Sequence, residues 1–195
     1  MTTFIFGSSA IALYLLGWTA YVLELSNRVR LKTPVIQIFT GLAIILHGFA
    51  SFGLLLHDGG LDLSLLKILS LLALVINSLV FLSGLREPIH SLYLALLPIS
   101  VVTLVLALIS SSTKSTAVIP YSLQAHILTS IIAYSFLAIA ALQALLVGYQ
   151  NWQLKHKHQN RLMRTLPALE TMEKFLFKLI WVGEILLTAS LITGF

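Results

Sequence analysis

Residues 121–148 read YSLQAHILTSIIAYSFLAIAALQALLVG, a run of apolar and small residues without aspartate, glutamate, lysine or arginine. A helix needs about 20 such residues to cross the hydrocarbon core of a bilayer. Only helices and closed barrels satisfy their backbone groups in lipid, and this run is continuous instead of alternating, which excludes a barrel strand. The stretch therefore predicts a membrane-spanning helix.

The rest of the chain repeats this pattern. Its 195 residues are 58% hydrophobic and only 10% charged, whereas soluble domains carry about 25% charged residues. High hydrophobicity with low charge also excludes a disordered chain. Apolar runs cover residues 4–23, 35–56, 63–85, 91–109, 121–148 and 176–195. We predict an all-α fold, a polytopic transmembrane helix bundle of about six spans, with residues 1–195 forming a single transmembrane domain.

Lysine and arginine are concentrated on one side of the predicted membrane. Ten of the twelve lie in or beside the loops that follow the first, third and fifth runs: Arg28, Arg30, Lys32, Arg86, Lys155, Lys157, Arg161, Arg164, Lys174 and Lys178. The other side holds only Lys67 and Lys114. Cytoplasmic loops collect lysine and arginine, so both termini are predicted to lie outside the cytoplasm.

A short amphipathic stretch, residues 166–175, precedes the last run. Leu166, Leu169, Met172 and Leu176 fall near one helical face. Two interpretations stay open: a separate helix lying in the membrane interface, or an N-terminal extension of the last span.

Several kinds of chemistry are excluded by composition. The chain has no cysteine, which excludes disulfides, thiolate metal sites and covalent attachment of c-type haem to this chain. It has no phosphate-binding loop, nucleophile elbow or HExxH zinc motif. We therefore do not expect an enzyme.

Two of the six histidines, His47 and His126, lie within apolar runs. Counted from the outer side of the membrane, which is the C-terminal end of the run of His47 and the N-terminal end of the run of His126, they are roughly 13 Å and 9 Å deep at 1.5 Å per residue. Ionisable residues inside a membrane usually face a bundle interior or a cavity. Two neutral imidazoles at similar depth predict a shared ligand, for which haem iron is the candidate. The alternative is two separate histidines bonded to helix carbonyls or to serine and threonine.

His126 has polar neighbours on its own helical face. Ser130 and Tyr134 follow at four and eight residues, which keeps them on the same side of a helix. They are candidates for orienting the imidazole or for contacting haem propionates. Small hydroxyl residues also provide packing between membrane helices, and that interpretation stays open.

Two charged groups stand inside other runs. Lys67, Ser70 and Asn77 form a polar stripe on one face of the third run; Lys67 either extends to the interface or contacts an anion such as a carboxylate. Glu184 lies deep in the last run and is predicted to be a buried carboxylate, either paired with a cation or protonated.

Three stretches resemble one known family. Residues 124–150, QAHILTSIIAYSFLAIAALQALLVGYQ, resemble the histidine-bearing helix of the cytochrome c assembly membrane proteins. Residues 166–195, LPALETMEKFLFKLIWVGEILLTASLITGF, resemble the next segment of that family, and residues 46–80 add a third match. The resemblance covers roughly residues 40–195. It is strongest to the HemX-like, YpjD-type branch of the superfamily that includes CcsA and CcmC.

The resemblance implies a haem-handling protein of the bacterial inner membrane, with apocytochrome c or other cytochrome-assembly subunits as partners. By motif, His126 corresponds to the haem-ligand histidine of the family and His47 to the histidine of an early transmembrane pair. The family implies further C-terminal helices and another histidine-containing segment beyond Phe195. The alternative function is a non-haem scaffold or regulatory partner of another membrane or haem-biosynthesis protein.

Overall fold

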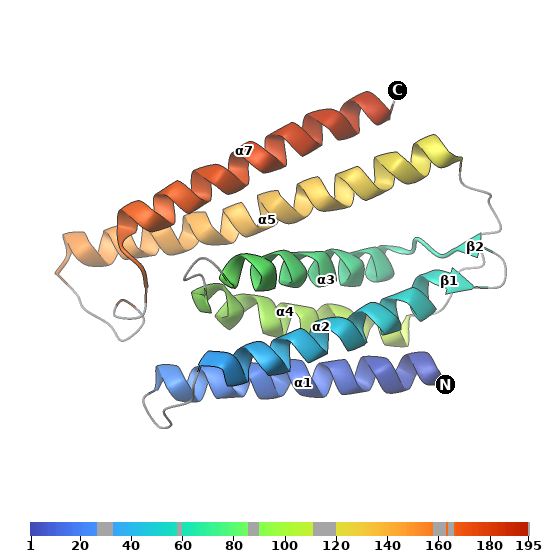
Figure 1. The fold of residues 1–195 in the computed structure, drawn as a ribbon, viewed down its shortest axis with the longest axis horizontal. Coiled ribbons are helices and arrows are strands. Elements are labelled where there is room, and N and C mark those ends of the chain that lie inside the picture. Colours follow the sequence, from blue (N-terminus) through green and yellow to red (C-terminus); the bar gives the residue numbers. More distant parts are fainter. Residues whose placement is uncertain are drawn as a thin grey trace. The chain divides into compact units, whose positions relative to one another are not determined.

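The computed structural model describes residues 1–26, 33–57, 60–85, 90–110, 120–157, 163 and 166–194. Within these residues the chain is helical apart from one very small hairpin (Figure 1). The elements are α1 (Thr2–Leu25), α2 (Thr33–Leu55), β1 (Leu56–His57), β2 (Gly60–Leu61), α3 (Leu65–Gly84), a 3-10 turn (His90–Leu92), α4 (Tyr93–Ile109), α5 (Tyr121–Lys155) and α7 (Leu169–Thr193). The predicted all-α membrane fold is confirmed.

Five of these helices, all except α4, are long and apolar enough to cross a membrane. The sixth, α4, is an apolar helix of 17 residues and so spans roughly 26 Å at 1.5 Å per residue. The six runs expected from the sequence therefore all form helices. The direction in which they cross the membrane stays a prediction.

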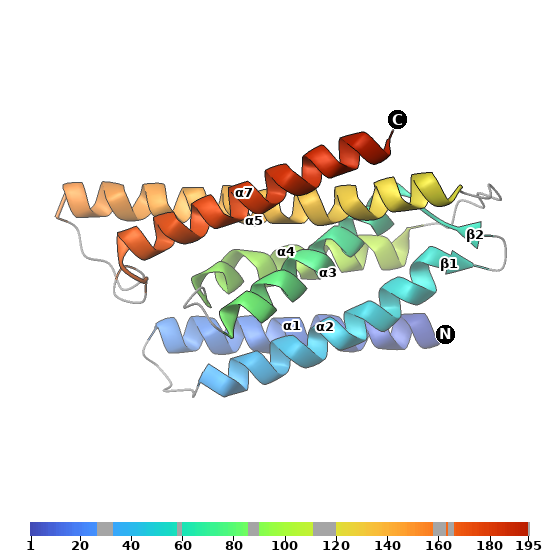
Figure 2. The same ribbon diagram turned by 45° about the horizontal axis from the view of Figure 1, so that its top comes forward.

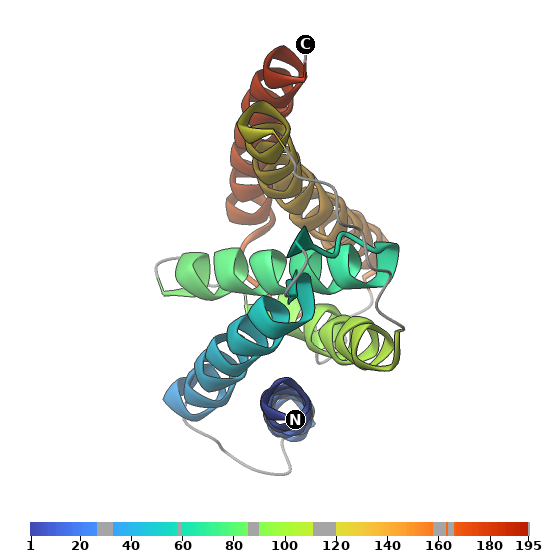
Figure 3. The same ribbon diagram turned by 90° about the vertical axis from the view of Figure 1, so that its right-hand side faces the viewer.

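The helices form two compact groups. The N-terminal group comprises Met1–Phe81 and Tyr93–Val118, and the C-terminal group comprises Leu82–Leu92 and Ile119–Phe195. In the N-terminal group α1 packs along α2 and α4, and Figure 3 views it nearly along the axis of α1. The C-terminal group is dominated by the pairing of α5 with α7 (Figure 2).

Close approach of α5 and α7 depends on a glycine. A Cβ atom added at Gly183 would lie 2.8 Å from Cδ2 of Leu137 on α5, which is closer than carbon atoms normally approach. In lipid there is no hydrophobic driving force for helix pairing, so membrane helices commonly associate through small residues that allow close packing.

A proline inside α4 is compensated by a tryptophan of α1. Pro98 has no backbone N–H, so the carbonyl of Leu94, four residues earlier, loses its helical partner. The indole Nε1–H of Trp18 donates a hydrogen bond to this carbonyl oxygen at 3.0 Å. An unsatisfied carbonyl in lipid would cost several kcal/mol, so this contact makes the proline tolerable.

Two helix boundaries differ from the sequence expectation. The fifth apolar run ends at Gly148, but α5 continues to Lys155. Hydrogen bonds of two glutamine side chains stabilise these last turns. The amide of Gln150 donates to the Pro167 carbonyl, and the amide of Gln153 donates to the Tyr149 hydroxyl. Leu169–Phe175 is continuous with the last span as α7. Of the two interpretations of that stretch, the N-terminal extension is therefore confirmed.

Candidate functional site

His126 lies in the second turn of α5, against the last turn of α7. Its Nδ1 is 2.8 Å from the backbone carbonyl oxygen of Ser190. A carbonyl only accepts hydrogen bonds, so Nδ1 carries the proton and donates it. In the neutral ring Nε2 then holds the free lone pair. No residue in the described part of the chain forms a hydrogen bond with Nε2.

This arrangement suits metal coordination. Ligand histidines generally donate their second ring N–H to a carbonyl or carboxylate, which fixes both the tautomer and the ring orientation. His126 is only partly buried between the two helices. His126 is thus prepared to offer Nε2 to a metal such as haem iron.

Ser130 also belongs to this cluster. Its hydroxyl lies 2.5 Å from the hydroxyl of Ser190, which is buried. The predicted stripe on α5 therefore meets α7 through Ser190, which bonds to both His126 and Ser130. Tyr134, the third member of the stripe, is 55% exposed, and in the described residues its hydroxyl has no hydrogen bond.

Sequence reasoning missed Ser190 and Gly194. Ser190 stands 64 residues from His126 and contributes a backbone carbonyl, for which side-chain patterns carry no signal. Gly194 packs directly on the ring: a Cβ there would lie 2.9 Å from both Cε1 and Nδ1 of His126. The small residues near the end of the last run were the only hint of this contact.

The glycine contact gives a prediction. Gly194→Ala is expected to displace the imidazole and weaken its bond to Ser190, which lowers haem affinity by up to about tenfold, the lower end of the effect of second-shell changes. Gly148→Ala is the matched control, since a Cβ there meets nothing within 4 Å. Hemin titration of the two variants in detergent measures the difference; equal affinities would contradict the contact.

His47 has a different environment in the N-terminal group. The ring is fully buried, with Nδ1 3.2 Å from the hydroxyl of Tyr14 and Nε2 2.9 Å from the hydroxyl of Ser70. Both ring nitrogens are therefore engaged. His47 thus bonds to hydroxyl groups, whereas His126 bonds to a helix carbonyl. These are contacts of the kind expected if the two histidines are separate buried residues that do not share a ligand. A shared ligand stays a prediction.

Lys67 does not extend to the interface. It is buried, and its Nζ lies 2.6 Å from Oδ2 of Asp62, which is also buried. The contact with a carboxylate, the second of the two interpretations, is therefore correct. The hydrogen bond from Lys67, supported by the backbone N–H of Ser64, holds the pKa of the Asp62 carboxyl below its usual value.

The position of Glu184 differs from the one predicted from the sequence. The prediction of a buried carboxylate is wrong, because the side chain is exposed on α7 beside the buried Gly183. Both faces of a membrane helix are apolar, so an apolar run does not tell which residues face the bundle. In the part of the chain that the structure describes, the carboxylate has neither a hydrogen bond nor an ion pair.

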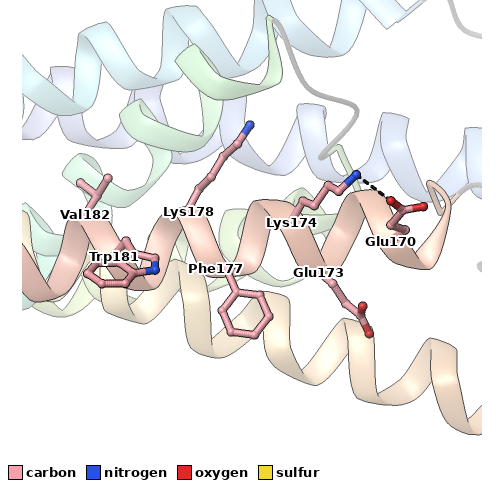
Figure 4. Close-up of a pocket in the computed structure, with 7 residues that line it drawn as sticks. All are labelled: Glu170, Glu173, Lys174, Phe177, Lys178, Trp181 and Val182. Carbon is pink, nitrogen blue, oxygen red and sulfur yellow. Dashed lines mark hydrogen bonds and ion pairs between the residues drawn. The ribbon is translucent and has the colours of Figure 1, made fainter.

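The exposed side of α7 carries a shallow hollow of about 650 Å³ (Figure 4). All of its lining residues come from α7: Glu170, Glu173, Lys174, Phe177, Lys178, Trp181 and Val182. It is a charged and aromatic surface, and it does not include His126, Ser130 or Ser190. Among the described residues no group of three histidine, aspartate or glutamate side chains could hold a bare metal ion.

Comparison with known proteins decides the family. The model of the cytochrome C assembly protein family matches residues 9–195. The chain belongs to the cytochrome c assembly family. The match includes α5 and α7, so the His126 cluster lies within the family region, and the resemblance found in the sequence is confirmed. No solved structure matches the chain.

Curated relatives agree with this assignment. The chain is 30% identical to "Inner membrane protein YpjD" of Escherichia coli strain K12 over 156 residues, which is 78% of this chain and 59% of the relative. The proteins of the same name from E. coli O6:H1 and O157:H7 match to the same extent. The chain thus matches only about three fifths of these relatives.

Proposed function

We propose that this protein binds haem non-covalently through His126 in the course of cytochrome c assembly, without catalysing covalent chemistry itself. The observation that carries the proposal is the bond from Nδ1 of His126 to the Ser190 carbonyl. It leaves Nε2 as the coordinating atom on a ring held by two helices. Family membership supports a role in haem handling.

The residues present fit haem as a ligand. Haem iron takes an imidazole nitrogen as an axial ligand, which His126 supplies, while Ser130 and Ser190 provide hydroxyl groups beside it. Tyr134 is a further candidate for contact with a propionate. The absence of cysteine means that haem is held without thioether bonds and so can be released to an acceptor.

We propose His47 as a second haem ligand, which requires that one of its hydrogen bonds breaks. Either its bond to Tyr14 or its bond to Ser70 has to break before a ring nitrogen can coordinate iron. His126 requires no such change, so we assign it the main role.

The setting we propose is the bacterial inner membrane, on the grounds of the apolar helices and the name of the curated relatives. The bias of lysine and arginine supports both termini outside the cytoplasm. In that orientation His126 lies near the outer surface, where an apocytochrome c or another assembly subunit is a suitable haem acceptor.

Hemin titration tests the function. The purified protein in detergent is expected to develop a Soret band as hemin is added and to retain it through gel filtration. A protein that stays colourless contradicts haem binding.

One observation favours the second candidate, a non-haem scaffold. Phe177, Trp181 and Glu184 are exposed on α7, and a carboxylate inside a membrane normally faces protein or a cavity. A colourless protein that still copurifies with another membrane protein, and loses it on Glu184→Ala, would favour this function.

A further inference from the structure

One side of α7 packs within the C-terminal group and another side is exposed. The packed side is formed by five buried residues: Met172, Phe175, Leu179, Gly183 and Ser190. We define the α7 seam by five exposed residues on the other side: Phe177, Trp181, Glu184, Thr188 and Leu191. They follow one another at intervals of four, three, four and three residues. This is the spacing by which two helices of a left-handed coiled coil contact each other.

Two polar groups of the α7 seam lack partners within the membrane span. Glu184 stands nine residues before Thr193 at the end of α7, roughly 14 Å along the helix and so near the middle of a hydrocarbon core about 30 Å thick. Trp181 is 69% exposed. Among the described residues, neither the carboxylate of Glu184 nor the indole N–H of Trp181 has a hydrogen bond. Lipid chains offer none, so this side of α7 is suited to contact protein.

Membrane insertion restricts how a second copy of the chain can cover this seam. Copies of one protein cross the membrane in the same direction, so a symmetric dimer has its two-fold axis along the membrane normal. The two α7 helices are then parallel, and each seam residue lies at the depth of its counterpart. In this geometry every seam side chain inserts among four residues of the facing helix. For Trp181 these four include Glu184 of the other copy, so the unpaired donor meets the unpaired acceptor, and symmetry makes this contact twice.

The charges beside the α7 seam are complementary to themselves in the same arrangement. Glu173 and Lys178 are both exposed, and they point to opposite sides of the helix, flanking the aromatic residues (Figure 4). They are five residues apart, the spacing at which flanking positions of parallel coiled-coil helices form ion pairs between chains. Glu173 of each copy would lie opposite Lys178 of the other. Charge complementarity therefore selects a second copy as the occupant of this face.

We propose that the α7 seam is the contact between two copies of this protein, which associate in the membrane with their α7 helices parallel. Thr188 fits such a contact, because it is small and its hydroxyl already bonds the backbone carbonyl of Glu184 at 2.9 Å. Membrane helices approach closely at small residues of this kind. The proposal does not depend on haem binding, since His126 contacts α7 through Ser190, on its packed side.

Cysteine cross-linking in membranes tests the contact. The chain has no cysteine, so a single introduced thiol reports on its own position. Thr188→Cys and Leu191→Cys, in the full chain and oxidised with copper phenanthroline, are expected to give mostly disulfide-linked dimer. Val182→Cys is the control on α7, since Val182 is 40% exposed but lies outside the seam. Leu145→Cys, at a position 71% exposed on α5, is a second control. Both are expected to give severalfold less dimer.

A charge exchange tests the identity and register of the partner. Two differently tagged copies of the chain are expressed together, and the fraction that copurifies in detergent is measured. Glu173→Lys in both copies places lysine opposite Lys178 and is expected to lower copurification severalfold. Glu173→Lys in one copy with Lys178→Glu in the other restores opposite charges at both sites and is expected to restore copurification. Only a second copy in parallel register predicts this rescue.

Three results would overturn the proposal. The first is equal cross-linking of Leu191→Cys and Val182→Cys. The second is linkage of the seam cysteines only to a different protein, which would assign this face to another partner. The third is copurification that stays unchanged in the charge variants or is not restored by the exchange. All variants replace exposed side chains, so the packing of α7 on α5 is expected to be retained.

Discussion

Asp62→Asn is expected to destabilise the protein by about 3–5 kcal/mol, the usual cost of removing one partner from a buried ion pair. It takes away the carboxylate that lies 2.6 Å from the Lys67 ammonium, and both side chains are almost fully buried. Thermal unfolding in detergent, followed by circular dichroism, measures the loss. The double variant Asp62→Asn/Lys67→Met is expected to recover most of it, because no charge then remains buried.

A matched exposed pair provides the control. Glu170 and Lys174 are also 2.6 Å apart, but their side chains are 77% and 70% exposed. Exposed helical pairs contribute only about 0.3–0.5 kcal/mol, so Glu170→Gln should leave the melting temperature nearly unchanged. Equal effects of Asp62→Asn and Glu170→Gln would contradict the role of burial.

The same pair implies a pH dependence. The pKa of Asp62 is lowered in the folded protein, mainly by the hydrogen bond from Lys67. A carboxyl with a depressed folded-state pKa contributes stability above its unfolded pKa and loses it as the pH falls through the folded value. Stability from this pair is therefore complete at neutral pH and is lost only below about pH 4.

His126→Gly is expected to reduce hemin affinity by more than about a hundredfold, since second-shell partners alone are typically worth 10–100-fold. The variant removes the proposed iron ligand and leaves a space for free imidazole. Added imidazole should restore the Soret band. Rescue of this kind separates a ligand from a residue that only supports the fold.

His156→Gly is the matched control for His126→Gly. The Nδ1 of His156 also donates to a backbone carbonyl, that of Trp152, at 2.8 Å. This bond lies within one helix turn, and the imidazole is exposed beside the Trp152 ring. The variant should bind hemin as wild type does. Loss of hemin from both variants would show non-specific binding to histidines.

The sequence was sufficient to predict the helices and the polar stripe of α3. Continuous apolar runs have one stable form in a bilayer, so the six helices followed from chemistry alone. Ser70 and Asn77 were predictable as one polar face of α3 because they recur at helical spacing with Lys67, but the burial of that face was not predicted. Asp62 was not foreseen as the partner of Lys67, since it lies outside the apolar runs.

Contacts between helices were beyond the reach of the sequence. The role of Ser190 depends on its backbone carbonyl, and that of Gly194 on the absence of a side chain. Glu184 was misplaced for a related reason: a run that is apolar on all sides does not say which side faces another helix. The stripe beside His126 was predicted, but the helix that completes it was not.

The iron–histidine stretching band in the resonance Raman spectrum of the ferrous, haem-loaded protein is the most direct test of coordination by His126. We expect a band in wild type that shifts when histidine is labelled with heavy nitrogen. We expect the band to be absent from His126→Gly and to return with added imidazole. The same band in His126→Gly without imidazole would contradict coordination by Nε2 of His126.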